Sequence, residues 1–514
     1  MDKGEGRRVE LKLTRETLRF ERLVNRGEEQ VTIEGEAALP GSMRDAVTVL
    51  SVQAQTHLTD AQAGRDEAGV RGRVCFQVLY TQGDLTRVRA LETCCDFVHA
   101  LPLAGVSPAM RVSASAAVQE TEGTAASGRM TLRALLTVSA EAFETIEQEL
   151  VTGAEDAEGA RIAGEANLQT RTQTAVFCVG ETLGENKTLV REEFDLPART
   201  EVGDVLSATA TASAGELSGG SGRIGVSGRI EVRVLHRPKE PGNPLVTTVH
   251  ELPFDLTVDT ARFDEGAQPQ AVAEVMDVMA DSVENEKGRT LRVEAEVRVR
   301  LNQCRQRQAE LLEDLYSLTG PAIEPVAQTL DVHTSEEHAD VRESTRLQVA
   351  LPKDAQPIGT MLAGFVQPMI SAVSPAGKRL NAEGVMNVTL IYLPVDSDIP
   401  VSVRTREPFV MTFPVEATDD VRAQAYPIET TTGPTTSDRA EIRCVLGLRT
   451  RQHGVQRIRG VTDVTERPQE GQEHGFVLVW PSAGETRWDT ARRLRVAEGG
   501  LRPAGKRALL AFRR

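Results

Sequence analysis

Aromatic residues are scarce in this chain. Phe, Trp and Tyr together make up 4% of its 514 residues, whereas apolar residues as a whole make up 40%. The hydrophobic cores must therefore be built mainly from Val, Leu, Ile and Ala, which favours small β domains. Because a single core stops growing at roughly 250 to 300 residues, a chain of this length is expected to form several domains.

Long apolar runs are missing as well. No stretch approaches the roughly 20 apolar residues of a membrane-spanning helix. The sequence begins MDKGEGRRVELKL, with charges where a secretory signal would need an apolar segment. These absences predict a protein without a membrane span that is made and kept in a cytoplasm.

Cysteine is infrequent, and no two cysteines are spaced as a CxxC pair. This distribution favours buried, unreactive thiols over a disulfide framework or a zinc site. The six cysteines are Cys75, Cys94, Cys95, Cys178, Cys304 and Cys444.

Positive charge is in deficit over most of the chain. The net charge of −16 argues against nucleic-acid binding, because phosphate would be repelled. From Gly475 onward, however, nine Lys and Arg residues face three acidic residues, a balance of +6 that leaves −22 for the remainder. This asymmetry predicts a basic terminal module with a partner of its own.

One strand pattern occurs three times. It begins at Gly72, Gly228 and Gly384, at intervals of 156 residues. In each copy, alternate residues are mostly apolar and the residues between them are mostly polar, so we expect a sheet with one face in a core and the other in water. The apolar positions are Val74, Phe76, Val78 and Tyr80, then Ile230, Val232, Val234 and His236, then Met386, Val388, Leu390 and Tyr392.

The landmarks around this strand also repeat in the same order. A Leu-Pro pair and an extended run precede each glycine, which predicts a hairpin, and a phenylalanine follows at Phe97, Phe254 and Phe409. We therefore predict a mainly β protein of three tandem all-β domains, each a sandwich or open barrel, over residues 8–150, 168–318 and 341–456. Linkers are expected at 152–166, 320–340 and 462–474, and the run 303–318 could form a short helix or extend a sheet.

The last forty residues, 475–514, hold both tryptophans and predict a small βααβ module. Residues 476–480 alternate as a strand, and a helix from Trp488 to Leu494 is expected after a turn at Gly484. Thr486 is placed to cap that helix, and Asp489 favours the positive end of its dipole. Trp488 is interpreted first as a core residue, because a large aromatic usually anchors a small domain.

No motif predicts catalysis, a cofactor or a metal. The glycine cluster 215–228 lacks the GK[ST] and helix context of a phosphate loop, so we interpret it as a hairpin loop. His333 and His338 lie in an acidic stretch without the spacing of a zinc site, which predicts a solvated linker. We expect no catalytic, cofactor-binding or metal-binding residues.

The terminal run GETRWDTARRLRV resembles a LysM module, although the second half departs from that family. The three glycine strands, the Asp-Leu-Tyr-Ser sequence at 314–317 and the terminal run together resemble the clostridial SipL family of spore-coat morphogenetic proteins, with SPOCS (DUF3794) repeats and a C-terminal LysM domain. The resemblance implies that the partner-binding surface includes Glu485, Thr486, Trp488, Arg492, Arg493 and Arg495.

The same resemblance implies a function. Such proteins act in the mother-cell cytoplasm at the forespore surface, where they bind the morphogenetic ATPase and other coat proteins and help the coat to encase the spore. A non-enzymatic scaffold is therefore the first hypothesis. The alternative is a cell-wall protein that binds peptidoglycan or another glycan, and an enzyme is a third class for which the chain offers no candidate residues.

Overall fold

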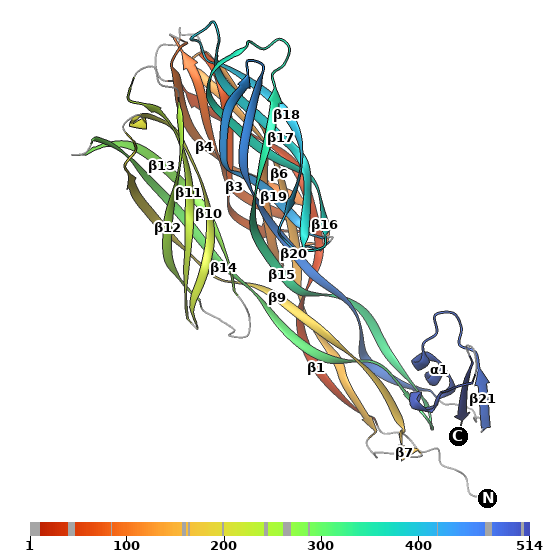
Figure 1. Cartoon of the computed structure of the whole chain (residues 1–514). Helices are drawn as coiled ribbons and strands as arrows, with labels where there is room; N and C mark the ends of the chain where they lie inside the picture. The colour runs from red at the N-terminus through yellow and green to blue at the C-terminus, as the bar shows by residue number, and fades with distance from the viewer. Residues whose placement is uncertain are drawn as a thin grey trace, which may run out of the picture.

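A computed structural model describes residues 11–513 of the chain, apart from 40–46, 84, 157–160, 163–164, 198–199, 221, 241–244, 261–268, 286–287, 419, 468–474 and 505–507. The described chain is mainly β, as predicted, and forms several small sheets. The sheets gather at one end of an elongated molecule, and long strands continue from them towards the other end (Figure 1).

Each sandwich consists of two three-stranded antiparallel sheets. The first has sheets β1-β6-β5 and β2-β3-β4, the second β13-β14-β9 and β10-β11-β12, and the third β15-β20-β19 and β16-β17-β18. The order of strands is the same in all three. Their bounds are β1 Leu11–Ala38, β2 Val47–Ala63, β3 Glu67–Gln82, β4 Val88–Pro102, β5 Arg111–Ala126, β6 Arg129–Asp156, β9 Leu168–Phe194, β10 Val202–Gly220, β11 Arg223–Pro238, β12 Val246–Asp259, β13 Gln270–Asn285, β14 Gly288–Ser317, β15 Ala322–Ala350, β16 Ile358–Ala376, β17 Arg379–Pro394, β18 Val401–Phe413, β19 Arg422–Thr436 and β20 Arg439–Arg467.

The repeated strand lies at the centre of one sheet in every sandwich, as β3, β11 or β17. The four predicted core positions in each copy are all buried, and the predicted hairpins are the antiparallel pairs β2-β3, β10-β11 and β16-β17. The glycine cluster at 215–228, predicted to be a hairpin loop, belongs to the second of these hairpins but lies mostly in its strands, because β10 pairs with β11 up to Gly220 and Arg223. Each core lies between the two sheets of its sandwich.

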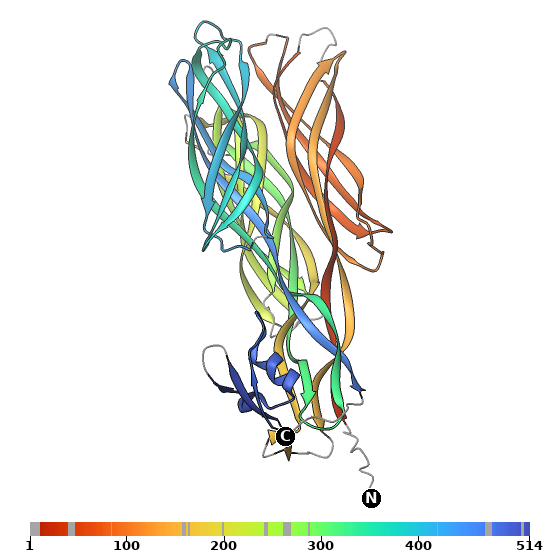
Figure 2. The same cartoon turned by 90° about the vertical axis from the view of Figure 1, so that its right-hand side faces the viewer.

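Most of the polar face of the repeated strand is covered rather than in water, which corrects the prediction, although Arg73 and Arg229 beside the glycines remain exposed. The three sandwiches lie against one another, and Figure 2 shows the first, in red and orange, beside the third, in cyan and blue. The outer faces of the sheets that contain the repeated strand meet where the sandwiches touch. Hydrogen bonds join the sandwiches there, from Asn387 Nδ2 to the Gln119 carbonyl at 3.1 Å and from Arg449 Nη2 to the Ala212 carbonyl at 3.1 Å. We call the apolar cluster at this meeting point the central junction; it contains Leu50, Leu79, Val88, Leu206, Leu235, Ala363 and Ile391.

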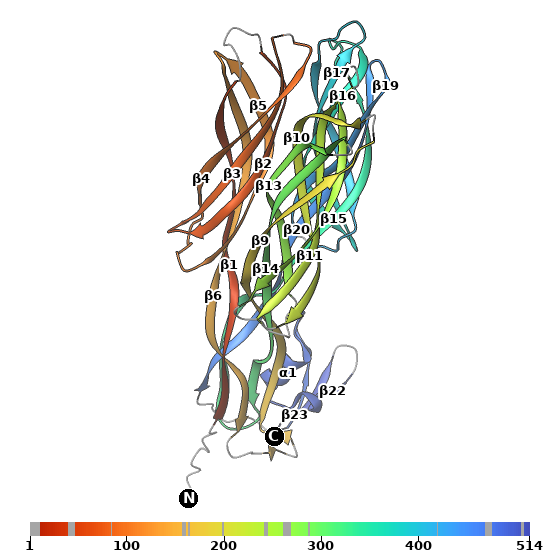
Figure 3. The same cartoon turned by 90° about the vertical axis from the view of Figure 1, so that its left-hand side faces the viewer.

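Below the sandwiches, the six long strands β1, β6, β9, β14, β15 and β20 form a stalk (Figure 3). They run on past their sandwich cores as three antiparallel pairs, and residues from all three pairs pack into shared clusters. The stalk clusters contain Leu18, Phe20, Leu150, Ala175, Phe177, Ala309, Leu311, Val332 and Ile458, then Val151, Leu168, Leu312, Leu315, Ile323 and Val461.

The stalk explains why the expected linkers are wrong in part. Residues 322–340 form the first half of β15, residues 152–156 form the end of β6, and residues 462–467 form the end of β20. The rest of these expected linkers lies partly outside the described residues, at 157–160, 163–164 and 468–474. Between 157 and 166, only the short strands β7 (Arg161–Ile162) and β8 (Glu165–Ala166) are described. The ambiguous run 303–318 extends β14 as a strand rather than forming a helix. In these segments, polar and apolar residues alternate less regularly than in the sandwich strands, because the buried face of each segment contacts the other strand pairs of the stalk.

The cysteines also depart from the prediction of unpaired thiols. Cys75 of β3 forms a disulfide with Cys94 of β4, and Cys178 of β9 forms one with Cys304 of β14. Cys95 and Cys444 are free. In both disulfides the partners lie on neighbouring strands of one sheet, with Cα atoms 4.0 and 5.8 Å apart, and this proximity depends on strand register rather than on sequence spacing.

The terminal module lies beside the far end of the stalk (Figure 1). Its sheet has the order β21-β23-β22. The predicted βααβ arrangement is not supported, because the described residues contain one α-helix, followed by a single turn of 3₁₀ helix. The bounds are β21 Gly475–Val479, α1 Arg487–Leu494, η2 Glu498–Gly500, β22 Arg502–Pro503 and β23 Leu509–Arg513.

Candidate functional site

The helix of the terminal module begins and ends at residues that fix its position. At the start, the Thr486 hydroxyl accepts a hydrogen bond from the Asp489 amide, and the Thr486 amide donates to Asp489 Oδ2 at 2.9 Å. This reciprocal capping box confirms the predicted cap and lowers the pKa of Asp489, because both the hydroxyl and the amide of Thr486 stabilise its ionised form. At the end, Arg495 adopts a left-handed conformation that terminates the helix.

The buried face of α1 contacts the stalk as well as its own module. Trp488 is only 6% exposed, as its interpretation as a core residue predicted. Its ring meets that of Tyr316, near the end of β14, edge to face with centroids 5.0 Å apart. The Tyr316 hydroxyl donates to the Val496 carbonyl at 2.8 Å. Tyr316 and Leu318 therefore complete the small core of the module.

Asp314 is the polar centre of this contact. Its Oδ2 accepts hydrogen bonds from Trp488 Nε1 at 2.8 Å and from Arg492 Nη1 at 3.0 Å. The carboxylate is buried, so these two donors satisfy a charge that would otherwise be costly in this position. Arg171 of β9 lies over the Trp488 ring, with its guanidinium carbon 5.3 Å from the ring centroid.

Arg495 makes the second polar attachment. Its guanidinium donates to the Ser317 carbonyl at 2.7 Å, to the Ser317 hydroxyl at 2.6 Å and to the Gly320 carbonyl at 3.0 Å. These acceptors belong to the last residue of β14 and to the turn that follows it. The fork of donors in an arginine therefore fixes both the position and the rotation of the module on the stalk.

The six predicted partner-binding residues thus divide into two groups. Trp488, Arg492 and Arg495 contact the stalk. Glu485, Thr486 and Arg493 form hydrogen bonds and ion pairs within the module itself, where Arg493 pairs with Glu485 at 2.9 Å. A hydrogen bond from the Ser482 amide lowers the pKa of Glu485 and keeps it ionised.

A second surface of the module is apolar and exposed, and we call it the aromatic face. Phe476, Leu478 and Trp480 follow one another on one side of β21 and its end, exposed to 76, 47 and 61%, while Val479 points into the core. Phe512 of β23, 47% exposed, lies opposite Phe476 with ring centroids 4.9 Å apart. We did not predict this surface from the sequence. Although residues 476–480 are predicted to alternate as a strand, all five are apolar, and a strand that buries one face must leave the apolar side chains of the other face exposed.

The histidines of the expected solvated linker are not in solvent. His333 lies in β15, is 3% exposed and stacks on His453 of β20 with ring centroids 5.0 Å apart. His338 is half-buried and contacts Glu336. Among the described residues, no group of three or more His, Cys, Asp or Glu side chains is arranged to hold a metal ion.

Comparison with known proteins gives one match. Residues 45–125, which contain β2 to β4 and almost all of β5, match the family model described as SipL, SPOCS domain. The match supports a SipL-like family and indicates a sporulation-related role. No curated protein and no solved structure matches the chain. In the described part of the chain, the single α-helix is too short to cross a membrane.

Proposed function

We propose that this chain is a non-enzymatic scaffold of spore-coat assembly that works in the mother-cell cytoplasm at the forespore surface. Its terminal module binds the morphogenetic ATPase on that surface, and its three sandwiches hold other coat proteins. The matched SPOCS domain supports the sporulation role. The observation that carries the binding role is the aromatic face, which is exposed on a module firmly attached to the stalk.

The composition of the aromatic face supports a protein partner. Contiguous exposed apolar side chains mark interaction sites, and large aromatics contribute most of the energy in many interfaces. Phe476, Trp480 and Phe512 are of this kind. The module also carries an excess of six positive charges, which would speed its encounter with an acidic partner.

The attachment to the stalk supports a scaffold role. Because Trp488, Arg492 and Arg495 hold the module against residues 314–321, little freedom remains to be lost when a partner binds. These three residues therefore act from beneath the binding surface rather than on it. Further weak contacts through the sandwiches would add avidity without stronger individual sites.

The test is binding of the purified full chain to the sporulation ATPase. A variant with Phe476→Ser and Trp480→Ser should bind at least about tenfold more weakly, since each aromatic anchor contributes on the order of 1–2 kcal/mol or more. A truncation ending at His474 should lose binding altogether. Val98→Ser is a matched control, because Val98 is 75% exposed but lies on β4 of the first sandwich.

Two further results complete the design. Asp314→Asn, which loosens the module without altering the aromatic face, should weaken binding less than the double variant does. Wild-type affinity in the double variant would refute the proposed surface. Saturable pull-down by purified peptidoglycan that requires residues 475–514 would support the glycan-binding alternative instead.

A further inference from the structure

Arg233 is a partly buried cation that forms no ion pair within the described part of the chain. It lies on β11, on the polar face that turns towards the other sandwiches, at the position equivalent to Gln77 and Thr389. Its one hydrogen bond to the described residues runs from Nη1 to the Thr430 hydroxyl of β19 at 3.3 Å. Burial lowers the pKa of Arg233 to about 10, and no acidic side chain opposes that effect. A guanidinium in this setting is unfavourable unless an anion joins it.

On one side of Arg233, the polar side chains are neutral groups that can donate hydrogen bonds. A void of about 10 Å³ beside it has no Asp or Glu in its lining. It lies next to the central junction, to which Leu235 of its lining belongs. The polar side chains that line it with Arg233 are Gln53, Ser207, Thr209, Thr247 and Thr430, drawn from all three sandwiches.

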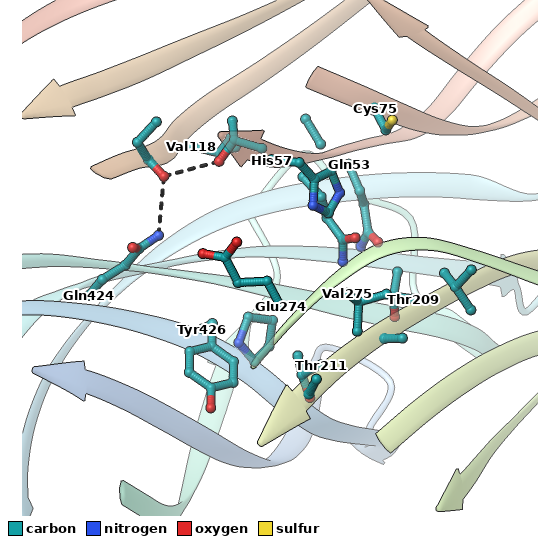
Figure 4. A pocket seen from close by; sticks show the side chains of 18 of the residues that line it. Gln53, His57, Cys75, Val118, Thr209, Thr211, Glu274, Val275, Gln424 and Tyr426 are labelled. Atoms are coloured by element: carbon teal, nitrogen blue, oxygen red, sulfur yellow. Dashed lines mark hydrogen bonds between the residues drawn. The ribbon is translucent and has the colours of Figure 1, made fainter. Parts of the chain in front are cut away.

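This void adjoins a larger cavity. The two share Gln53, Thr209 and Arg233, and the larger one has a volume of about 270 Å³. Figure 4 shows it from close by, with Gln53 and Thr209 among the labelled side chains around it. The void alone holds about one water molecule. A ligand larger than water would have to lie in the larger cavity, on the side lined by the three shared residues.

The acidic residues of the larger cavity do not neutralise Arg233. Glu231 is paired with Arg342, and Glu274 is paired with Arg298. Glu92 and Asp277 also line the cavity, but neither forms an ion pair with Arg233. The guanidinium and the neighbouring hydroxyls remain as a set of donors that matches the acceptors of a carboxylate or a phosphate.

We propose that the cavity beside the central junction binds a small oxyanion, a carboxylate or phosphate group, against Arg233. The bound anion would offset the buried charge and would touch all three sandwiches at once. It would therefore stabilise their packing against one another. This site is separate from the aromatic face and does not depend on the function proposed for the terminal module.

The experiment measures binding of inorganic phosphate, and separately of acetate and citrate, to the full chain by calorimetry and by thermal unfolding. Chloride at matched ionic strength is the reference. We expect a saturable rise in melting temperature with at least one of the oxyanions. Arg233→Gln should weaken that anion at least about tenfold, since a charge-assisted hydrogen bond is removed from a buried site. Because phosphate and the two carboxylates are tested separately, the result also shows whether the site prefers a phosphate or a carboxylate group.

Two variants keep the test decisive. Arg229→Gln is the matched control, because Arg229 lies on the same strand, is about half exposed and should leave anion binding unchanged. Arg233→Lys keeps the charge and should retain part of the affinity, even if Arg233→Gln does not fold. The proposal is overturned if no oxyanion binds saturably to the wild-type chain, or if Arg233→Lys and Arg229→Gln lose the same affinity.

Discussion

At the scale of single residues, the repeated glycine and the repeated phenylalanine form one structural device. Gly72, Gly228 and Gly384 lie opposite Phe97, Phe254 and Phe409 on the neighbouring strand. In each pair, the phenylalanine ring lies over the glycine, within 3.0 Å of the place where a Cβ atom would be. The ring occupies the space that a side chain would fill, so the two residues recur together.

Gly228→Ala should therefore destabilise the second sandwich. The added methyl would lie 2.3 Å from Phe254 Cζ and 2.5 Å from the Ser213 carbonyl, so both strands must move. We expect a loss of about 1–3 kcal/mol in the free energy of unfolding, measured by chemical denaturation. Gly433→Ala, where nothing lies within 4 Å, should change it by less than about 0.5 kcal/mol. Equal effects of the two substitutions would contradict this explanation.

At the scale of elements, the first and third sandwiches are joined through a buried charged cluster between β6 and β20. Glu141 of β6 contacts His453 and Arg451 of β20, and Phe143 packs against both His333 and His453 with ring centroids 5.0 Å apart. Arg111 of β5 lies over the Phe143 ring and binds Glu21 of β1 and Glu336 of β15. The histidines are thus enclosed by strands from two sandwiches.

This cluster predicts a loss of stability in mild acid. Burial lowers the pKa of His333 from 6.5 to about 4, assisted by the nearby His453 and Arg111 and opposed by Glu21 and Glu336. Below pH 6.5 the unfolded chain takes up a proton that the folded chain does not accept until about pH 4. The contribution of neutral His333 is therefore complete above pH 6.5 and falls by about 3 kcal/mol as the pH drops to 4.

Thermal unfolding of His333→Leu between pH 4 and 7 checks this effect, because the variant should depend less steeply on pH than the wild type. Val455→Ser, at a 55% exposed position of β20 without a titratable group, should keep the wild-type slope. Glu141 adds to the slope only at the acid end of this range, where the unfolded chain begins to protonate a carboxyl with an ordinary pKa of 4.5, and it does so in the wild type and the variant alike. Burial raises its pKa, but the His453 hydrogen bond and the charges of Arg451 and Arg422 lower it overall to about 2. An unchanged slope in His333→Leu would exclude His333 as the cause.

At the scale of the whole molecule, the central junction holds three similar sandwiches in one arrangement. Leu79, Leu235 and Ile391 occupy the same position of the repeated strand, and all three enter one apolar cluster. Each sandwich already has its own core. The junction is therefore needed for assembly rather than for the folding of any one sandwich.

Leu235→Asp should separate these two roles. A charge in the apolar cluster should drive the sandwiches apart and increase the radius of gyration in small-angle X-ray scattering, while the β content by circular dichroism stays close to wild type. Leu189→Asp, at a 62% exposed position of the same sandwich, should leave both measurements unchanged. A compact Leu235→Asp variant would show that the stalk alone determines the arrangement.

Much of the local structure could be predicted because it depends on neighbours in sequence. Alternation from Val74 to Tyr80 predicted a strand with one buried face, and Thr486 with Asp489 predicted the start of α1. The partner surface was harder to predict. Trp488, Arg492 and Arg495 resemble a binding patch in the sequence, but their partners, Asp314 and Ser317, are more than 170 residues away.

The sequence by itself determined the β class of the chain, the recurrence of one strand pattern at 156-residue intervals and the position of a basic terminal module, because these follow from periodicity and composition. The tertiary structure alone decided where the polar faces go, which cysteines meet and which side of the terminal module remains exposed. Those outcomes depend on contacts between segments that are distant along the chain. A polar strand face looks the same in the sequence whether it meets water or another sandwich.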